Sequence, residues 1–444
     1  MKMKSLFKKI TCLILFLVSG FAHATIPIQA WQHPSGASIY LVQTDAIPMI
    51  DIQIDLEVGS LLDPKDKSGV AAMTADFLNK GSWLNGKILS EAQVSDEFAD
   101  QGAVFSASAG FERTSLRVRT LSDPKRRSAV IELIAKILKT PQFDEKILKR
   151  EKDRTITAIQ EADSKPETIL GKEFDRQIYG DHPLSREITV ESIKKIHAED
   201  LKYFYFKRYA QEGAKITLVG DIDKDLANQV VVQIMSALPK NSKHHEKVPE
   251  VKFLDKKPAN ERLIKMTHPS QQAHISMGMP TIKRKSPDYY PMFLGNYILG
   301  GGGFVSRLMK EVRENRGLAY SVYSYISPGR YIGPFVAGMQ TKKEQSDLAI
   351  DVMRNTISEF IKNGPSDAEI NSAKENLING FPLRIDSNKK ILDNVANIAW
   401  NDLPLDTLDT WTEKINAVTK EQVIDAYKKY LDMDSIVTVV VGAP

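Results

Sequence analysis

The stretch GGGGFVSRLMKEVRENRGLAYSVYSY, residues 300–325, is the most informative part of this chain. Four glycines allow bare backbone to approach a neighbour or a ligand closely. Apolar residues spaced four apart from Phe304 to Val312 then predict a helix over that segment. Gly317 is expected to end the helix, and residues 318–323 have the composition of a strand. We interpret the whole stretch as a working surface of the protein.

The first 24 residues have the pattern of a Sec-type signal peptide. Four lysines precede an apolar run over residues 10–21, which is too short to span a membrane. Ala22-His23-Ala24 matches an A-x-A cleavage site. We therefore predict export to the periplasm, with cleavage near Ala24. The single cysteine, Cys12, lies inside this segment, so the mature chain is expected to have no disulfide.

The mature chain is expected to be a globular protein with no net charge. Of the 444 residues, 42% are hydrophobic and 26% charged, which is ordinary for folded domains, and the length predicts at least two of them. Without the four lysines of the signal peptide, 56 basic side chains face 56 acidic ones. This balance excludes the basic surface of a nucleic-acid-binding protein.

The chain contains an internal repeat of roughly 220 residues. Three pairs of segments recur at nearly the same offset: 52–58 and 275–279, 193–201 and 415–423, and 216–220 and 438–442. Each repeat mixes strand and helix patterns. This predicts an α+β fold of two homologous α/β domains in tandem, each a mainly antiparallel sheet with helices packed on one face. The expected boundaries are 25–238 for the N-terminal domain, 239–258 for a polar linker, and 259–444 for the C-terminal domain.

Several motifs resemble those of the M16 peptidase family, which includes pitrilysin, insulinase and the mitochondrial processing peptidase. The resemblance covers nearly all of residues 28–444. Its motifs are Gly300-Gly-Gly-Gly-Phe304-x-Ser306-Arg307-Leu308, Arg313-Glu-x-Arg316-Gly-Leu-Ala-Tyr320, Tyr179-Gly-Asp-His182-Pro183-Leu184, Val219-Gly220-Asp221 and Gly59-Ser60-x-x-Asp63-Pro64. The chain is most similar to the short-chain bacterial members. The resemblance implies two homologous halves and the pairing of subunits into a closed clamshell.

In that family, the two histidines of an inverted His-x-x-Glu-His motif, on the helix after the first strand, bind zinc together with a Glu on a later helix, and the motif Glu can act as general base. The spacing places the three motif residues on one helix face. Here Ala72, Ala75 and Asp76 stand at the motif positions, and Ala158 stands at the later ligand position. The neighbouring Glu151 is retained. We therefore expect no catalytic zinc and no cofactor in this chain, while Asp76 with Glu151 leaves weak binding of a harder ion open.

The resemblance gives the stretch at 300–325 a defined role. The family's glycine-rich segment, an arginine and a tyrosine seven residues further on face the zinc across the chamber. The matching residues here are Gly300, Gly301, Gly302, Gly303, Arg313 and Tyr320. The resemblance implies that the glycines bind substrate and that Arg313 and Tyr320 contact its backbone and help hold the developing oxyanion. Both side chains are donors that can be aimed at new negative charge in a partly dry chamber.

Some short-chain members divide the active site between two chains, one with the zinc motif and one with the Arg/Tyr pair. This chain resembles the second kind. We expect a non-catalytic, substrate-binding subunit of a heterodimeric zinc endopeptidase. Its partner would keep His-x-x-Glu-His and the zinc, and the substrate would be a peptide or an unfolded polypeptide. Two alternatives remain open: an inactive homodimer that binds peptides or scaffolds a complex, and a peptidase with an unrecognised metal site.

Overall fold

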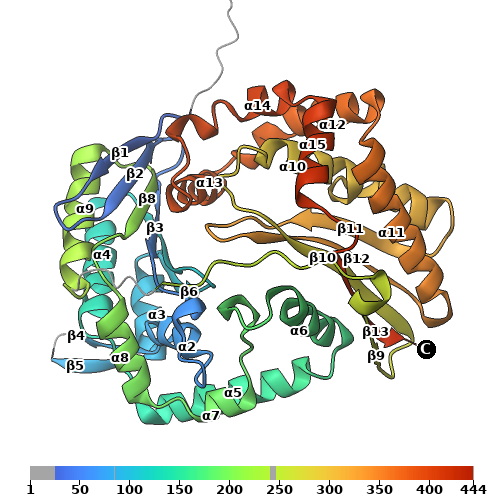
Figure 1. The fold of residues 1–444 in the computed structure, drawn as a ribbon. Helices are drawn as coiled ribbons and strands as arrows, with labels where there is room; N and C mark the ends of the chain where they lie inside the picture. The colour runs from blue at the N-terminus through green and yellow to red at the C-terminus, as the bar shows by residue number, and fades with distance from the viewer. Residues whose placement is uncertain (1–25, 85, 241–246, 444) are drawn as a thin grey trace, which may run out of the picture.

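The computed structural model describes residues 26–84, 86–240 and 247–443, which form two halves, each built on one sheet (Figure 1). The first sheet has the strand order β1-β2-β8-β3-β7-β6. Its strands are β1 (Gln29–Gln32), β2 (Ser38–Gln43), β3 (Met49–Leu56), β6 (Val104–Ala109), β7 (Thr114–Leu121) and β8 (Lys215–Gly220). A separate hairpin of β4 (Gly81–Leu84) and β5 (Lys87–Ser90) belongs to the same half.

The second sheet has the strand order β11-β12-β10-β13-β9. Its strands are β9 (Leu263–Thr267), β10 (Gln272–Ile282), β11 (Ala319–Ile326), β12 (Gly333–Lys342) and β13 (Val437–Ala443). The order repeats that of the first sheet, with β9 in the place of β2 and β13 in the place of β8. In both sheets this pair is parallel and the other pairs are antiparallel. The predicted duplication and the mainly antiparallel sheets are confirmed.

Amphipathic helices pack on one face of each sheet. In β3, Ile50, Ile52 and Ile54 alternate with polar residues and are buried against this helical layer, where each fully buried side chain contributes about 1.5–3 kcal/mol. The helices of the first half are α2 (Val70–Phe77), α3 (Glu91–Asp100), α4 (Pro124–Lys139), α5 (Glu145–Ala162), α6 (Pro166–Tyr179), α7 (Val190–Lys194), α8 (Ala198–Arg208) and α9 (Lys224–Ala237). Those of the second half are α10 (Tyr289–Asn296), α11 (Ser346–Asn363), α12 (Asp367–Asn379), α13 (Asn388–Trp400), α14 (Trp411–Ala417) and α15 (Lys420–Tyr430).

The other face of each sheet is covered by a helix from the opposite half. On α6, Leu170, Phe174 and Ile178 pack against apolar residues of β12 and β13 in the second sheet. Helix α13 lies in the same way on β8 and β3 of the first sheet (Figure 1). The predicted helical layer on one face is thus joined by an exchanged helix on the other, and this exchange ties the two halves together.

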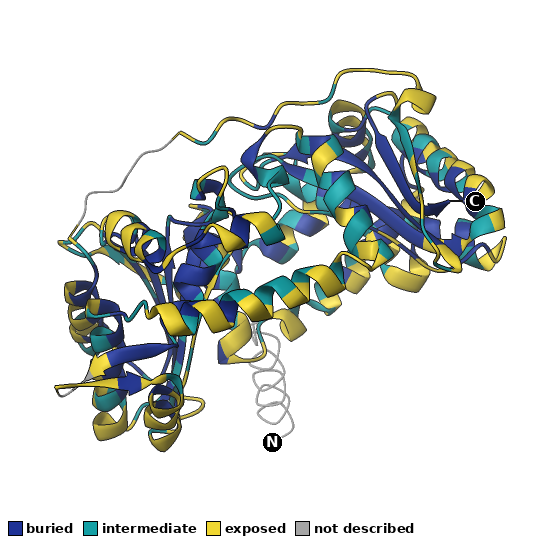
Figure 2. Cartoon of the chain, turned by 90° about the horizontal axis from the view of Figure 1, so that it is seen from below, coloured by how far each residue is buried: buried dark blue, intermediate teal, exposed yellow. Residues whose placement is uncertain are grey.

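The predicted signal peptide, residues 1–24, lies outside the described residues. Within the residues that the structure describes, no helix is long and apolar enough to cross a membrane. The described part of the predicted linker, from Lys247 onward, runs as an extended segment along the outside of both halves (Figure 2).

Candidate functional site

Helix α2, which carries the zinc-motif positions, is held at its start by Asp63. The Asp63 carboxylate accepts hydrogen bonds from the backbone N–H groups of Gly69 (2.7 Å) and Ala71 (2.8 Å), which satisfies two free donors of the helix. Burial raises the pKa of Asp63 to about 6, although these two N–H groups oppose the shift. At Gly59 a Cβ would lie 2.3 Å from the carbonyl oxygen of Phe111, so glycine is required there. The motif at residues 59–64 therefore fixes the position of the N-terminal end of α2.

The three zinc-ligand positions, Ala72, Asp76 and Ala158, do not fit a zinc ion in this chain, and the general-base position is Ala75. On α2, Ala75 is fully buried and Ala72 half-buried, and their methyl groups offer no ligand atom. Ala158 is exposed on α5. Asp76 alone carries donor atoms, and its carboxylate is already in an ion pair. Within the described residues, no group of three or more His, Cys, Asp or Glu side chains could hold a metal ion.

The ammonium group of Lys80 lies among the carboxylates beside the former zinc position. Lys80 Nζ is 2.7 Å from Oε1 of Glu91 and 3.5 Å from Oδ2 of Asp76. Oε1 of Glu151 is 3.7 Å away, and the side chains of Lys80 and Glu151 are 8% and 10% exposed. Arg150 bridges Glu91 and Glu151, at 2.5 Å from each carboxylate. In this group, here called the Lys80 cluster, one buried ammonium group faces three carboxylates.

The charges of the Lys80 cluster depend on one another. Burial acts to lower the pKa of Lys80, but the hydrogen bond to Glu91 and the charges of Asp76 and Glu151 outweigh it and raise that pKa. The hydrogen bond from Lys80 lowers the pKa of Glu91, whereas burial raises the pKa of Asp76. Lys80 therefore stays charged at neutral pH and opposes the weak ion binding through Asp76 and Glu151 that the sequence left open. The sequence signal for the Asp76–Lys80 ion pair was the position of Lys80 one helical turn after Asp76.

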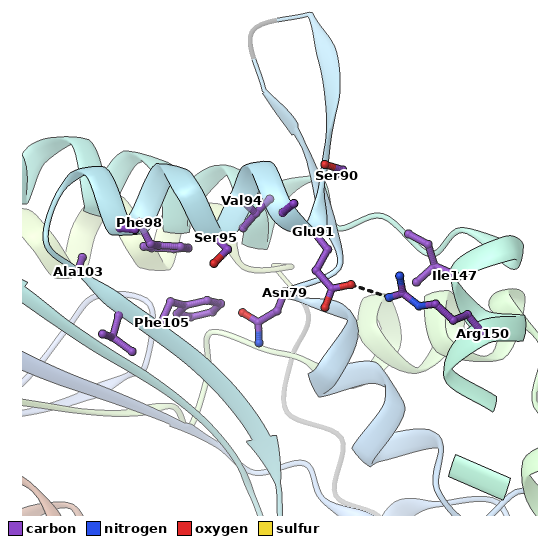
Figure 3. Close-up of a pocket in the computed structure, with 13 residues that line it drawn as sticks. Asn79, Ser90, Glu91, Val94, Ser95, Phe98, Ala103, Phe105, Ile147 and Arg150 are labelled. Carbon is purple, nitrogen blue, oxygen red and sulfur yellow. Dashed lines mark hydrogen bonds and ion pairs between the residues drawn. The ribbon is translucent and has the colours of Figure 1, made fainter. Parts of the chain in front are cut away.

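A cavity of about 920 Å³ opens beside the Lys80 cluster, between α3, β6 and α5 (Figure 3). Val94, Phe98 and Phe105 give it apolar walls, and the ion-paired Glu91 and Arg150 lie at one end. Strand β6 is an edge of the first sheet, and its free N–H and C=O groups can pair with an extended peptide. An apolar cavity beside a free strand edge suits a peptide side chain. The sequence did not identify this cavity.

The glycine-rich segment is shaped by close contacts within the chain. Gly300 is buried, and a Cβ there would lie 2.5 Å from the backbone nitrogen of Ser324 in β11. A Cβ at Gly301 or at Gly302 would lie 2.7 Å from an atom of the preceding turn. Gly303 has a φ of 62°, which favours glycine, and no atom lies within 4 Å of a Cβ there. The glycines thus permit a tight turn whose backbone is exposed at Gly301 and Gly303.

The helix predicted for residues 304–312 is wrong at its start. Gly303–Val305 form a 3-10 turn, and the helix that follows is wound as a π-helix over Met309–Glu314. The left-handed backbone at the fourth glycine interrupts the helix, so Phe304 lies outside it and is 69% exposed. The strand predicted for residues 318–323 is confirmed as β11.

Arg307 fastens the glycine-rich turn to α12. Its Nε and NH2 groups donate to the two carboxylate oxygens of Glu369 (2.5 and 2.6 Å), and NH2 also donates to the carbonyl oxygen of Gly364 (2.9 Å). Burial acts to raise the pKa of Glu369, but the Arg307 hydrogen bonds and those of a neighbouring serine lower it to about 2. The Ser306 hydroxyl donates to the carbonyl oxygen of Gly303 (2.7 Å). Both motif residues therefore have structural roles.

The structure brings Arg313 and Tyr320 together. The guanidinium carbon of Arg313 lies 4.7 Å from the ring centre of Tyr320 and 5.1 Å from that of Phe304, so the cation rests against two aromatic rings. Tyr320 is 83% exposed, and its hydroxyl has no hydrogen-bond partner within the described residues. The hydroxyl is thus free to bind a group outside this chain. The sequence did not assign Phe304 to the site, because this contact forms only across the turn.

His182, the histidine of the Tyr179 motif, has a structural role. Its Nε2 lies 2.8 Å from the carbonyl oxygen of Pro249, and its Nδ1 accepts a hydrogen bond from the backbone N–H of Leu184 (3.1 Å). The histidine therefore fastens the linker to the segment that follows α6.

Known protein families match two long segments of this chain. The family described as Insulinase (Peptidase family M16) matches residues 40–191, and that described as Peptidase M16 inactive domain matches residues 195–377. The chain is 26% identical over 400 residues to the non-peptidase homolog YmxG of Helicobacter pylori, with 89% of each protein covered. It is 23% identical over 402 residues to the uncharacterized zinc protease YmxG of Bacillus subtilis, which covers 89% of this chain and 94% of that protein.

Solved structures share the fold. The crystal structure of a peptidase M16 inactive domain from Pseudomonas fluorescens is 31% identical, with a TM-score of 0.88 over 94% of this chain and 98% of that one. The periplasmic protease PqqL from Escherichia coli has a TM-score of 0.78 at 16% identity, over 94% of this chain and 45% of PqqL, which shows a common fold alone. The family matches and the Pseudomonas structure together show that this chain belongs to peptidase family M16.

Proposed function

We propose that this chain is the non-catalytic, substrate-binding subunit of an M16 zinc endopeptidase. In this proposal it supplies Arg313 and Tyr320 to the active site of a zinc-bearing partner. The supporting observation is that one chain combines zinc-motif positions without ligand atoms, at Ala72 and Ala158, with a half-buried Arg313 that lies against the exposed Tyr320. The name of the Helicobacter relative, a non-peptidase homolog, also supports a chain that is inactive by itself.

The chemistry of the pair supports this role. Peptide hydrolysis places negative charge on the scissile carbonyl oxygen, and donors already aimed at that oxygen stabilise the transition state. The Tyr320 hydroxyl is free, and Arg313 is held beside it by two aromatic rings. Removing one such donor typically costs about 3 kcal/mol, or roughly 100-fold in kcat.

The test is reconstitution with an M16 chain that retains His-x-x-Glu-His. Each chain and the mixture are assayed with an internally quenched, unstructured peptide. We expect cleavage by the mixture alone, and a loss of about 100-fold in kcat with Tyr320→Phe and little change in KM. Tyr203→Phe is the matched control, because Tyr203 is 64% exposed on α8. Full activity of the zinc-bearing chain alone, together with no effect of Tyr320→Phe, contradicts the proposal.

The 920 Å³ cavity beside β6 supports a second candidate function, an inactive homodimer that binds peptides. Sedimentation of the purified chain alone separates the two functions. A stable dimer that binds unfolded peptides and excludes a zinc-bearing chain favours the homodimer. A monomer that forms a one-to-one complex with that chain favours the heterodimer.

We also propose that the mature protein is periplasmic. The support is the signal-peptide pattern of residues 1–24. N-terminal sequencing of the protein recovered from a periplasmic extract should give a start near Thr25. An uncleaved protein confined to the cytosol contradicts this location.

A further inference from the structure

A second cavity, of about 390 Å³, lies at the seam between the two halves. The first half contributes the turn between β6 and β7 and part of α6. The second half contributes the hairpin between β11 and β12 and the end of α13. Figure 1 shows α6 beside the second sheet at this seam. The seam cavity shares no lining residue with the cavity beside the Lys80 cluster, so the two are separate.

Asp175 of α6 lines the seam cavity and is half-buried. Its carboxylate has no hydrogen bond or ion pair within the described residues, whereas Glu173 on the same helix is paired with Arg176 at 2.6 Å. Burial, and then the charge of Glu187, raise the pKa of Asp175 to about 6, so the group is ionised at neutral pH. A half-buried carboxylate without a partner is unfavourable unless a ligand brings a cation.

The other walls of the seam cavity also suit a cation. Tyr179, Tyr325 and Tyr331 present aromatic surface to it, and aromatic faces attract ammonium and guanidinium groups. Glu112 adds a second carboxylate, whose oxygens accept hydrogen bonds from the indole N–H of Trp400 (2.9 Å) and the backbone N–H of Tyr331 (3.3 Å). The cavity thus combines aromatic faces with two acidic groups.

Among the described residues that line the cavity, Arg113 is the one cationic side chain, and it is already neutralised. Its NH1 group lies 3.0 Å from Oδ2 of the buried Asp55, and its guanidinium carbon lies 5.0 Å from the ring centre of Trp400. The uncompensated charge facing the cavity is therefore negative, which favours a cation over an anion.

Tyr320, Tyr323 and Tyr325 are all exposed on the edge strand β11 and are here called the tyrosine row; the strand register shifts between Ala319 and Val322, at Tyr320. The ring of Tyr323 lies against β12 where Gly338 leaves room, since a Cβ there would be 2.7 Å from the ring. The rings of Tyr323 and Tyr325 stack with centres 6.1 Å apart. The row starts beside Arg313 and ends at the seam cavity, which Tyr325 lines. It spans roughly 15 Å, or about four to five residues of extended peptide.

We propose that the seam cavity binds a cationic group of a peptide that lies along the tyrosine row. That group is an α-ammonium terminus or a Lys or Arg side chain, about four to five residues from the position that Tyr320 faces. It would pair with Asp175 and lie against the rings of Tyr179 and Tyr325. The peptide as ligand rests on the proposed function, whereas the preference for a cation rests on the cavity itself.

The test uses the purified mature chain without a partner, titrated calorimetrically with an amidated decapeptide of Ala, Ser and Gln. Three forms are compared: a free α-amine, an acetylated terminus, and an acetylated terminus with one internal Lys. The variant Asp175→Asn keeps the side-chain size and removes the charge. Asp181→Asn is the control, because Asp181 is exposed just after α6 and does not line the cavity. Thermal unfolding checks that both variants fold.

The wild-type chain should bind at least one cationic form about tenfold more tightly than the neutral acetylated form. Asp175→Asn should abolish this preference, and Asp181→Asn should keep it. The preferred form tells whether the cation is a terminus or a side chain. Equal binding of all three forms, no binding of any form, or a preference that survives Asp175→Asn overturns the proposal. Since no partner is present, a cation preference alongside a failed reconstitution would contradict the proposed function and leave this site standing.

Discussion

Replacing Lys80 by Met removes the cation of the Lys80 cluster and keeps a side chain of similar length. Glu151 is 10% exposed and loses a partner at 3.7 Å, and breaking a fully buried ion pair costs about 3–5 kcal/mol. Asp76 and Glu91 are 49% and 39% exposed, so water screens part of their uncompensated charge. We therefore expect the free energy of unfolding of the first half to fall by about 2–3 kcal/mol.

Differential scanning calorimetry measures this loss. For a unit of roughly 200 residues it corresponds to a fall in Tm of about 4–10 °C at pH 7.5. The matched control is Lys87→Met, because Lys87 is exposed on the neighbouring hairpin. In Lys80→Met the carboxylates lose their cation and bind protons more tightly when folded, so the difference from wild type should shrink as the pH falls toward about 4.

A Tm for Lys80→Met within about 1 °C of the Lys87→Met control at pH 7.5 would refute this reasoning. A rise in the wild-type Tm on adding stoichiometric zinc would also refute it, because a metal ion would then bind despite the ammonium group of Lys80.

Three further predictions concern stability. The folded pKa of Asp175, about 6, is above the ordinary value, so wild-type stability is lost as the pH rises from about 4 to 6. Urea unfolding should therefore show Asp175→Asn equal to wild type near pH 4 and about 1–2 kcal/mol more stable at pH 7.5, allowing for partial exposure. Phe174→Ala should lose about 3–4 kcal/mol by the same assay, because the buried ring packs on Gly278 at the exchanged helix. Arg307→Gln should lose about 1–2 kcal/mol by calorimetry, because it breaks the paired hydrogen bonds to Glu369; an unchanged Tm contradicts this.

Features that depend on residues close together in the chain could be predicted from the sequence. The repeat at 216–220 and 438–442 identified equivalent strands, because β8 and β13 both have an apolar run that ends in Val-Gly, at the offset of the repeat. The resemblance revealed the loss of zinc ligands at Ala72 and Asp76, because the family motif occupies one turn of one helix. The family resemblance paired Arg313 with Tyr320, and the two side chains meet because a single turn at Gly317 separates their elements. The start of the helix was misplaced because apolar spacing does not report the backbone angle of a glycine.

The tertiary structure alone decided which segments meet. Periodicity shows that one face of α6 is buried, but not that it lies on the sheet of the other half. Glu91 and Glu151 reach Lys80 from separate elements, so local spacing reveals the Asp76–Lys80 pair but not the other two carboxylates of the cluster. Asp175 carries no distinguishing sequence pattern, and its place in the wall of the seam cavity depends on contacts between the two halves. The sequence by itself thus determined the duplicated fold, the lost zinc ligands and the Arg313–Tyr320 pair. The tertiary structure determined the Lys80 cluster and the seam cavity, because both depend on contacts between segments far apart in sequence.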